Sequence, residues 1–332
     1  PADAELMLRI AATHPRFEGL LWQHVHRPQW FARFHEDAQI SAWLDGSNED
    51  MRNHALNSMS SAVNEYPGPI AELLVSRKTA PGYHDWLRRI IRCADVYRDR
   101  KLFTLVLEAV RHGAYDTVEH ELWLVMHDLA KHEPLWAIEL LQAHLIDHVD
   151  SLTRNEQGKV ALLCVREHFA AELVKEAASA EPLAFVQTVV PYLRHVMAST
   201  AMDERTDRPI RDRHFSMRNV GDVFEGRTLG ESLLAASVSS LEKMAKTMPE
   251  SIQSLLVDLA ADPYDASQFL LYRCFSASGK YFANWAGSIL LEGEHRLYCG
   301  YISDGNWAAR ELVRAIAPYV ADVTHQELEF LF

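Results

Sequence analysis

Glycine, proline and cysteine are scarce in this sequence. Fourteen glycines and thirteen prolines in 332 residues are few for an all-β protein, which needs many turns. The four cysteines are Cys93, Cys164, Cys274 and Cys299, and no two of them have the spacing of a metal site or a redox pair. Because each lies among apolar residues, we expect buried free thiols in a reducing compartment, which favours a cytoplasmic protein.

Long apolar runs are also missing. No stretch approaches the ~20 apolar residues that a membrane-spanning helix needs, and no charged-then-apolar leader opens the chain. We therefore expect no membrane partner. The chain begins with Pro1 and ends within an apolar stripe at Phe332, so we interpret it as a fragment of a longer protein.

Positive charge is outweighed by negative charge. The 33 lysines and arginines against 46 acidic residues give a net charge of −13, and phosphate binding requires clustered cations. We therefore do not expect nucleic acid as a partner. The alternative is a helical repeat that cradles a duplex along one basic stripe. The residues available for that stripe, besides those of the insert described below, are Arg88, Arg89, Arg92, Arg98, Arg100 and Lys101.

No catalytic or cofactor motif is present: the sequence has no phosphate-binding Gly-rich loop, nucleophile elbow or dinucleotide fingerprint. This segment is therefore not expected to be an enzyme or to hold a cofactor or metal. The alternative is a hydrolase built on His144, Asp147 and His148, because histidines four apart share one helix face where Zn²⁺ could bind. A third ligand is not evident.

What the sequence does contain is a series of amphipathic helices separated by prolines. Expected helices cover residues 3–13, 30–43, 49–65, 102–112, 117–131, 155–178 and 185–197. A proline recurs at the expected first turn of a second helix, where its missing N–H costs nothing. These marker prolines are Pro15, Pro67, Pro134, Pro182 and Pro249. The cleanest copy of the pattern is the stretch 226–291.

This recurrence favours an all-α protein, a right-handed α-solenoid of degenerate HEAT- or TPR-like helical hairpins. Residues 1–332 would then form one continuous helical-repeat domain. The alternative is a compact all-α bundle, because any helical protein can have prolines between its helices. Most of the eight tryptophans should pack in the core, and any that are exposed would be interface anchors.

Residues 201–228 depart from the helical pattern. They hold six acidic and six basic residues and few apolar ones, and such a long connection is often functional or disordered. One hypothesis is that this charged insert docks an acidic partner or a phosphate; the equal numbers of the two signs favour the alternative, a solvated loop whose charges pair internally. The candidate binding residues are Arg205, Arg208, Arg211, Arg213 and Arg218.

The C-terminal third carries a resemblance to a known family. It reads Asn284-Trp285-Ala286, Glu292-Gly293-Glu294-His295-Arg296-Leu297, Gly300 to Leu312, Ile316-Ala317-Pro318 and Glu327-Leu328-Glu329-Phe330. In its style of repeat this resembles the helical C-terminal sensor arrays of bacterial STAND NTPases, including the AVAST-type antiviral defence group. In that family an effector and a nucleotide-binding module precede a sensor that recognises a phage protein.

The resemblance implies a protein-binding sensor or scaffold whose partners are a large protein ligand, phage-encoded or other, and further modules of the same chain. The nucleotide-binding module is not within these residues, and no catalytic residue can be carried over. A helical-repeat domain that binds nucleic acid and a structural scaffold without a defence role are the alternatives.

Overall fold

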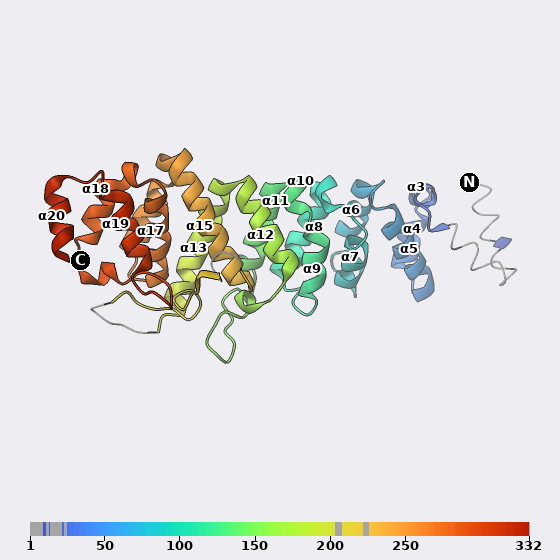
Figure 1. The fold of residues 1–332 in the computed structure, drawn as a ribbon. Coiled ribbons are helices and arrows are strands. Elements are labelled where there is room, and N and C mark those ends of the chain that lie inside the picture. The colour runs from blue at the N-terminus through green and yellow to red at the C-terminus, as the bar shows by residue number, and fades with distance from the viewer. Residues whose placement is uncertain are drawn as a thin grey trace. The chain divides into compact units, whose positions relative to one another are not determined.

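The computed structural model describes residues 9, 10, 13, 22, 25–202, 208–221 and 226–331 (Figure 1). Within these residues the regular structure is helical, and extended pairing is limited to isolated bridges. The chain divides into two compact units, Pro1–Val125 and Met126–Phe332. The single continuous domain stays a prediction, and the helix expected at 3–13 lies mostly outside the described residues, as does Pro15.

The first unit is a series of short helices. They are α3 (Pro28–Glu36), α4 (Gln39–Asp45), α5 (Glu49–Ala62), α6 (Pro67–Val75), α7 (Tyr83–Ile91), η1 (Val96–Arg98), α8 (Arg100–Arg111) and α9 (Glu119–Met126), which ends at the boundary. Helices α3 and α4 pack on α5, α5 packs on α7, and α6 packs on α8. Helices that are two positions apart in chain order therefore lie side by side, as stacked hairpins require.

Local signals explain where these helices begin and end. The Asn48 side chain caps α5 by accepting the N–H groups of Asp50 and Met51. Pro67 occupies the first turn of α6, as predicted. Gly113 follows α8 with a φ of 73°, the left-handed conformation that suits glycine after a helix.

The helix expected at 30–43 is wrong, because the chain breaks into α3 and α4 at Ala38, whose φ is 55°. The break has a packing reason. Phe34 and Ile40 are both buried, but residues six apart on one helix point about 120° apart. The turn between them lets both side chains face the same core.

The second unit repeats a helical hairpin. Its elements are α10 (Leu129–His132), α11 (Pro134–Leu145), η2 (Ala161–Cys164), α12 (His168–Ala180), α13 (Pro182–Ser199), α15 (Leu229–Thr247), η3 (Pro249–Ile252), α16 (Gln253–Ala261), α17 (Asp265–Ala277), α18 (Gly279–Leu290), η4 (Glu294–Leu297), α19 (Trp307–Ile316) and α20 (Asp322–Leu331). Helices α10, α12, α15, α17 and α19 each pack on the next of this row. The helices that lie between these in the chain are α11, α13, α16 and α18, and each of them packs on at least one helix of the row. This stacking confirms the predicted class, an all-helical repeat of the α-solenoid kind; its handedness stays a prediction.

The predicted prolines mark the return helix of each hairpin. Pro134, Pro182 and Pro249 occupy the first turns of α11, α13 and η3. At the corresponding start of α18 stands Gly279. A Cβ there would lie 2.2 Å from the carbonyl oxygen of Ala315 on α19, so only glycine allows this close approach.

The helix expected at 155–178 is also wrong over its first half. Residues 155–160 form a turn in which the Asn155 side chain accepts the N–H groups of Gln157 and Lys159, and Gly158 has a φ of 71°. Helix α12 begins only at His168. The segment expected at 117–131 is likewise interrupted between α9 and α10. In both stretches the apolar period predicted helical structure correctly, but it did not predict where a helix begins or is interrupted.

The exposure of the cysteines contradicts one expectation, and that of the tryptophans supports another. Cys274 and Cys299 are buried free thiols, Cys164 is half-buried, and Cys93 is exposed, contrary to the prediction for all four. None of the eight tryptophans is exposed, so they serve packing, and interface anchors must be sought elsewhere. No helix among the described residues is long and apolar enough to span a bilayer.

Candidate interaction site

Residues 208–221 of the charged insert are fixed by backbone hydrogen bonds on both sides. The Ile210 N–H donates to the Pro263 carbonyl at 2.8 Å, and Asp265 N–H donates to the Ile210 carbonyl at 2.9 Å. On the other side, Met202 N–H donates to the Arg211 carbonyl at 2.7 Å. The insert therefore lies as a short extended segment between the end of α13 and the start of α17.

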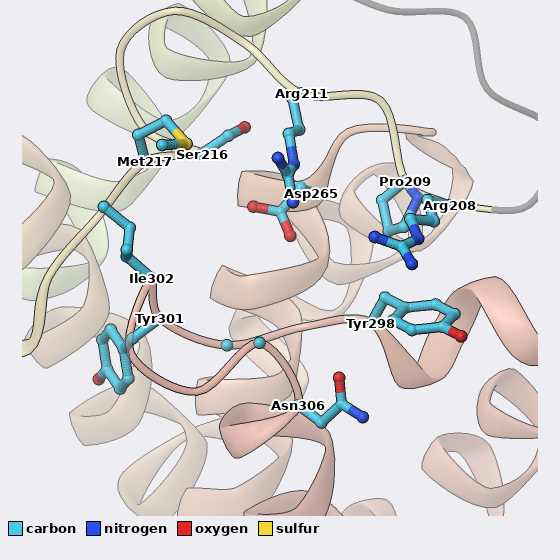
Figure 2. A pocket seen from close by; sticks show the side chains of 12 residues that line it. Arg208, Pro209, Arg211, Ser216, Met217, Asp265, Tyr298, Tyr301, Ile302 and Asn306 are labelled. Carbon is cyan, nitrogen blue, oxygen red and sulfur yellow. The ribbon is translucent and has the colours of Figure 1, made fainter.

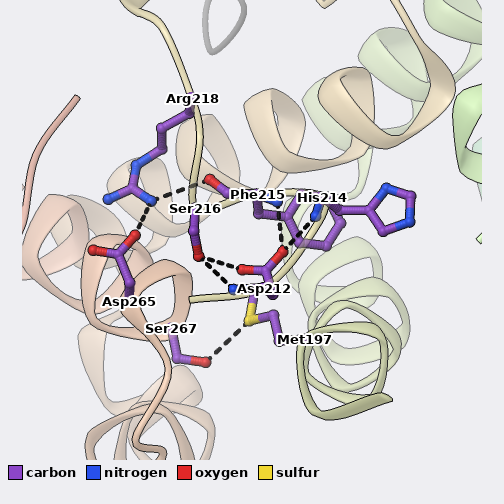
Figure 3. Close-up of polar contacts among 8 residues, drawn as sticks. All are labelled: Met197, Asp212, His214, Phe215, Ser216, Arg218, Asp265 and Ser267. Carbon is purple, nitrogen blue, oxygen red and sulfur yellow. Dashed lines mark hydrogen bonds and ion pairs between the residues drawn. The ribbon is translucent and has the colours of Figure 1, made fainter. Parts of the chain in front are cut away.

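A buried carboxylate shapes the turn that follows. Asp212 accepts the backbone N–H groups of His214 and Phe215 at 2.8 and 2.6 Å, and the Ser216 hydroxyl at 2.6 Å (Figure 3). Burial raises the pKa of Asp212, and these three hydrogen bonds oppose that rise. The Asp212 side chain thus takes the place of a backbone acceptor for the N–H groups of His214 and Phe215.

His214 ties the insert to the 155–160 turn. Its Nε2 accepts the Val160 N–H at 2.6 Å, a bond that only the unprotonated nitrogen can make. Burial, aided by the nearby charge of Lys159, lowers the pKa of His214 to about 4.

This contact predicts a loss of stability in acid. The unfolded His214 takes up its proton near its ordinary pKa of 6.5, whereas the folded one resists until about 4. Stability should therefore fall as the pH drops from 6.5 to 4, by roughly 2 kcal/mol after allowance for partial exposure. Urea denaturation of the wild type and of His214→Gln at pH 7 and pH 4.5 isolates this contribution as the difference. Equal pH dependence in both proteins would contradict it.

Arg218, one of the predicted binding residues, lies inside the protein. Its guanidinium forms an ion pair with Asp265 and donates to the Phe215 carbonyl at 3.1 Å (Figure 3). It also lies over the Phe269 ring at 4.1 Å. Burial is the largest single effect and would lower the pKa of Arg218, but the neighbouring groups, Asp265 first among them, together raise it above its ordinary value. These contacts give Arg218 a structural role, because they hold the insert against the start of α17.

A cleft of about 420 Å³ lies between the insert and the loop 298–306 (Figure 2). Arg208 and Arg211 come from the insert, and Tyr298 and Asn306 come from the loop. The Arg208 guanidinium lies over the Tyr298 ring at 4.6 Å, an arrangement that holds the cation in place. Among the described residues, neither arginine forms an ion pair.

Apolar side chains are exposed at and near this cleft. Met217, Tyr298 and Ile302, which line it, are 53%, 37% and 54% exposed. Two more exposed apolar side chains, Met202 and Val220, belong to the insert itself. Exposed apolar residues beside arginine are the composition of protein interfaces rather than of ordinary surface.

The five predicted arginines therefore have different positions. Arg208 and Arg211 line the cleft, Arg218 is buried, and Arg213 is exposed with its side chain close to Gly158. Arg205 lies outside the described residues. Sequence reasoning missed Tyr298 and Ile302. Their signal was an exposed-looking turn of Gly, Ser, Asp and Asn at 300–306 that nevertheless carries large apolar residues.

The histidines considered for a metal site are both buried. The His144 and His148 rings lie 6.0 Å apart, but His148 Nδ1 already accepts the Asp150 N–H at 3.0 Å. Across the described residues, no group of three His, Cys, Asp or Glu side chains is arranged to hold a metal ion.

The cations considered for nucleic acid in the first unit are largely neutralised by neighbours. Ion pairs join Arg88 to Asp85, Arg92 to Glu121, Arg98 to Asp95 and Lys101 to Glu72. Arg89 donates to two asparagine side chains. Such pairing leaves little net charge for a phosphate backbone, whose binding depends on unneutralised cations.

Comparison with known proteins identifies no relative of this chain. No protein-family model, no curated protein and no solved structure matches this chain. A functional inference must therefore start from the cleft, from its charge and from its exposed apolar side chains.

Proposed function

We propose that this chain is a protein-binding sensor or scaffold domain, and that the cleft between the insert and the loop 298–306 contacts its ligand. The observation that supports this is the combination of Arg208 and Arg211 with exposed Met217, Tyr298 and Ile302. Tyrosine, arginine and methionine are enriched where proteins meet, and truncating such anchors costs the most binding energy.

The helical repeat supports the same proposal. Each hairpin touches mainly its neighbours, so a long surface forms without long-range topology and can contact a large folded ligand. The resemblance to STAND sensor arrays supplies the ligand class, a phage protein or another large protein, recognised within a bacterial antiviral NTPase. Binding would then shift the relation of this domain to the other modules of the chain.

The cleft also indicates the chemistry of the ligand's contact. Arg208 is held over Tyr298 and Arg211 has no ion pair among the described residues, so both can pair with carboxylates. The apolar rim requires apolar side chains beside those carboxylates. We therefore propose that the ligand presents acidic and apolar residues together.

The proposal predicts that charge reversal in the cleft removes ligand binding. The tagged chain is used to capture proteins from phage-infected and uninfected bacterial lysates. A protein retained only from infected cells should bind the Arg208→Glu/Arg211→Glu variant at least tenfold more weakly, because two favourable charge contacts become repulsive. Tyr298→Ala should weaken it independently by removing an anchor.

Lys280→Glu is the matched control, since Lys280 is exposed on α18 and does not line the cleft. It should bind the retained protein as the wild type does. Loss of binding in Lys280→Glu to the same extent, or full binding by the double variant, would show that the cleft is not the contact.

A further inference from the structure

One groove in the row of helices is bridged differently from its neighbours. Lys131 of α10 pairs with Glu176 of α12 at 3.8 Å, and Glu242 of α15 accepts from Arg273 of α17 at 2.8 Å. Arg273 also lies over the ring of Trp307 on α19 at 5.4 Å. Between α12 and α15 the bridges are hydrogen bonds from Ser240 and Lys243 to the carbonyls of Ala178 and Ser179, and they lie at one end of a groove of about 710 Å³.

The groove is open because its floor is made of small side chains. On α15 they recur every three or four residues, so they share one face of that helix. The residues are Ser232, Ala235, Ala236, Ser239 and Ser240 on α15, with Ala171, Ala178 and Ser179 on α12. Leu173 of α12 and Leu233 of α15 are buried, and the two helices pack on each other. The small side chains of the floor leave the space above them open.

The rim of this groove carries more basic than acidic side chains, whereas the whole chain has a net negative charge. The rim holds Arg166, Lys175, Arg227 and Lys243 but only two carboxylates, Glu167 and Glu172. Glu172 is engaged by His168 at 3.2 Å. Among the described residues, Arg166 and Lys175 form no ion pair, and Lys243 donates only to the Ser179 carbonyl at 3.0 Å.

We propose that this groove binds an acidic α-helix of a partner protein. The α12 side runs from His168 to Ser179, about 18 Å and so about three helical turns. A small-residue floor lets a third helix approach closely, as in helix-in-groove recognition. Glutamates along its edges would meet Lys175 and Lys243. This site is separate from the cleft and does not depend on it.

A peptide probe tests the groove directly. The probe is a fluorescein-labelled, stapled helix of about 14 residues made of alanine and glutamate, with glutamates four apart; its partner has glutamine instead. Fluorescence anisotropy with the full chain should show at least tenfold tighter binding of the glutamate peptide. Lys175→Glu and Lys243→Glu should each weaken it about tenfold, and Ser239→Trp should block it by filling the floor.

Matched variants separate a specific groove from general attraction. Lys246→Glu changes the same charge on the same helix, but Lys246 is outside the groove, so binding should be unchanged. The Arg208→Glu/Arg211→Glu cleft variant should also bind the peptide normally. Equal weakening by Lys246→Glu, binding that survives Ser239→Trp, or equal competition by a single-stranded DNA of the same charge would overturn the proposal.

Discussion

Replacing Arg218 with methionine is expected to destabilise the second unit by about 3–5 kcal/mol, because the Asp265 carboxylate, whose side chain is only 13% exposed, then loses its counter-charge. Arg218 is 3% exposed, and its guanidinium donates hydrogen bonds to the Asp265 carboxylate and to the Phe215 carbonyl. Asp265→Ala should cost a similar amount for the converse reason. Each change also removes the side-chain contact between the insert and the start of α17, while the backbone hydrogen bonds of Ile210 with Pro263 and Asp265 remain.

Equilibrium urea denaturation measures this cost, and two further variants identify its cause. Arg218→Met/Asp265→Leu removes both charges and should lose less than either single change, since no buried charge is left alone. Arg314→Met removes an exposed pair with Glu311 and should cost about 0.5 kcal/mol. If Arg218→Met were as mild as Arg314→Met, the buried pair would not be what holds the insert.

Gly300→Ala is expected to cost about 3 kcal/mol and to deform the cleft, because there is no room for a side chain at this position. A Cβ on Gly300 would lie 2.1 Å from the Asp304 carbonyl oxygen and 2.7 Å from the Trp307 nitrogen. These are backbone atoms, which cannot rotate away, so the loop 298–306 must shift as a whole.

The same loop offers a control. Gly305 also lines the cleft, but a Cβ added there meets nothing within 4 Å, so Gly305→Ala should change stability by less than about 0.5 kcal/mol. Thermal denaturation measures both variants, and ligand capture shows whether the deformed loop still binds. Equal stability of the two alanine variants would contradict the close backbone approach at Gly300.

Much of the fold could be predicted because its signals are local. The prolines at 67, 134, 182 and 249 mark helix starts by steric exclusion alone, and the Asn48 cap depends only on its own first turn. The apolar periods that gave helices α5, α8 and α13 likewise need no knowledge of distant residues.

The errors arose where distant contacts overrode a local pattern. The apolar period across 30–43 continues through Ala38, but the core requires a turn there. The stretch at 155–178 lost its first half to a turn held by His214, a residue 54 positions away from Val160. Such a hydrogen bond leaves no periodic trace in the sequence.

For the candidate site, the sequence by itself determined that an arginine-bearing insert interrupts an acidic row of helical hairpins. Only the tertiary structure decided which arginines face outward. Arg208, Arg211 and Arg218 look alike as residues, yet Arg218 is buried against Asp265 and the other two line the cleft. The reason is physical: charge and hydrogen-bonding capacity belong to the residue, whereas burial and partners depend on which helices the fold places beside it.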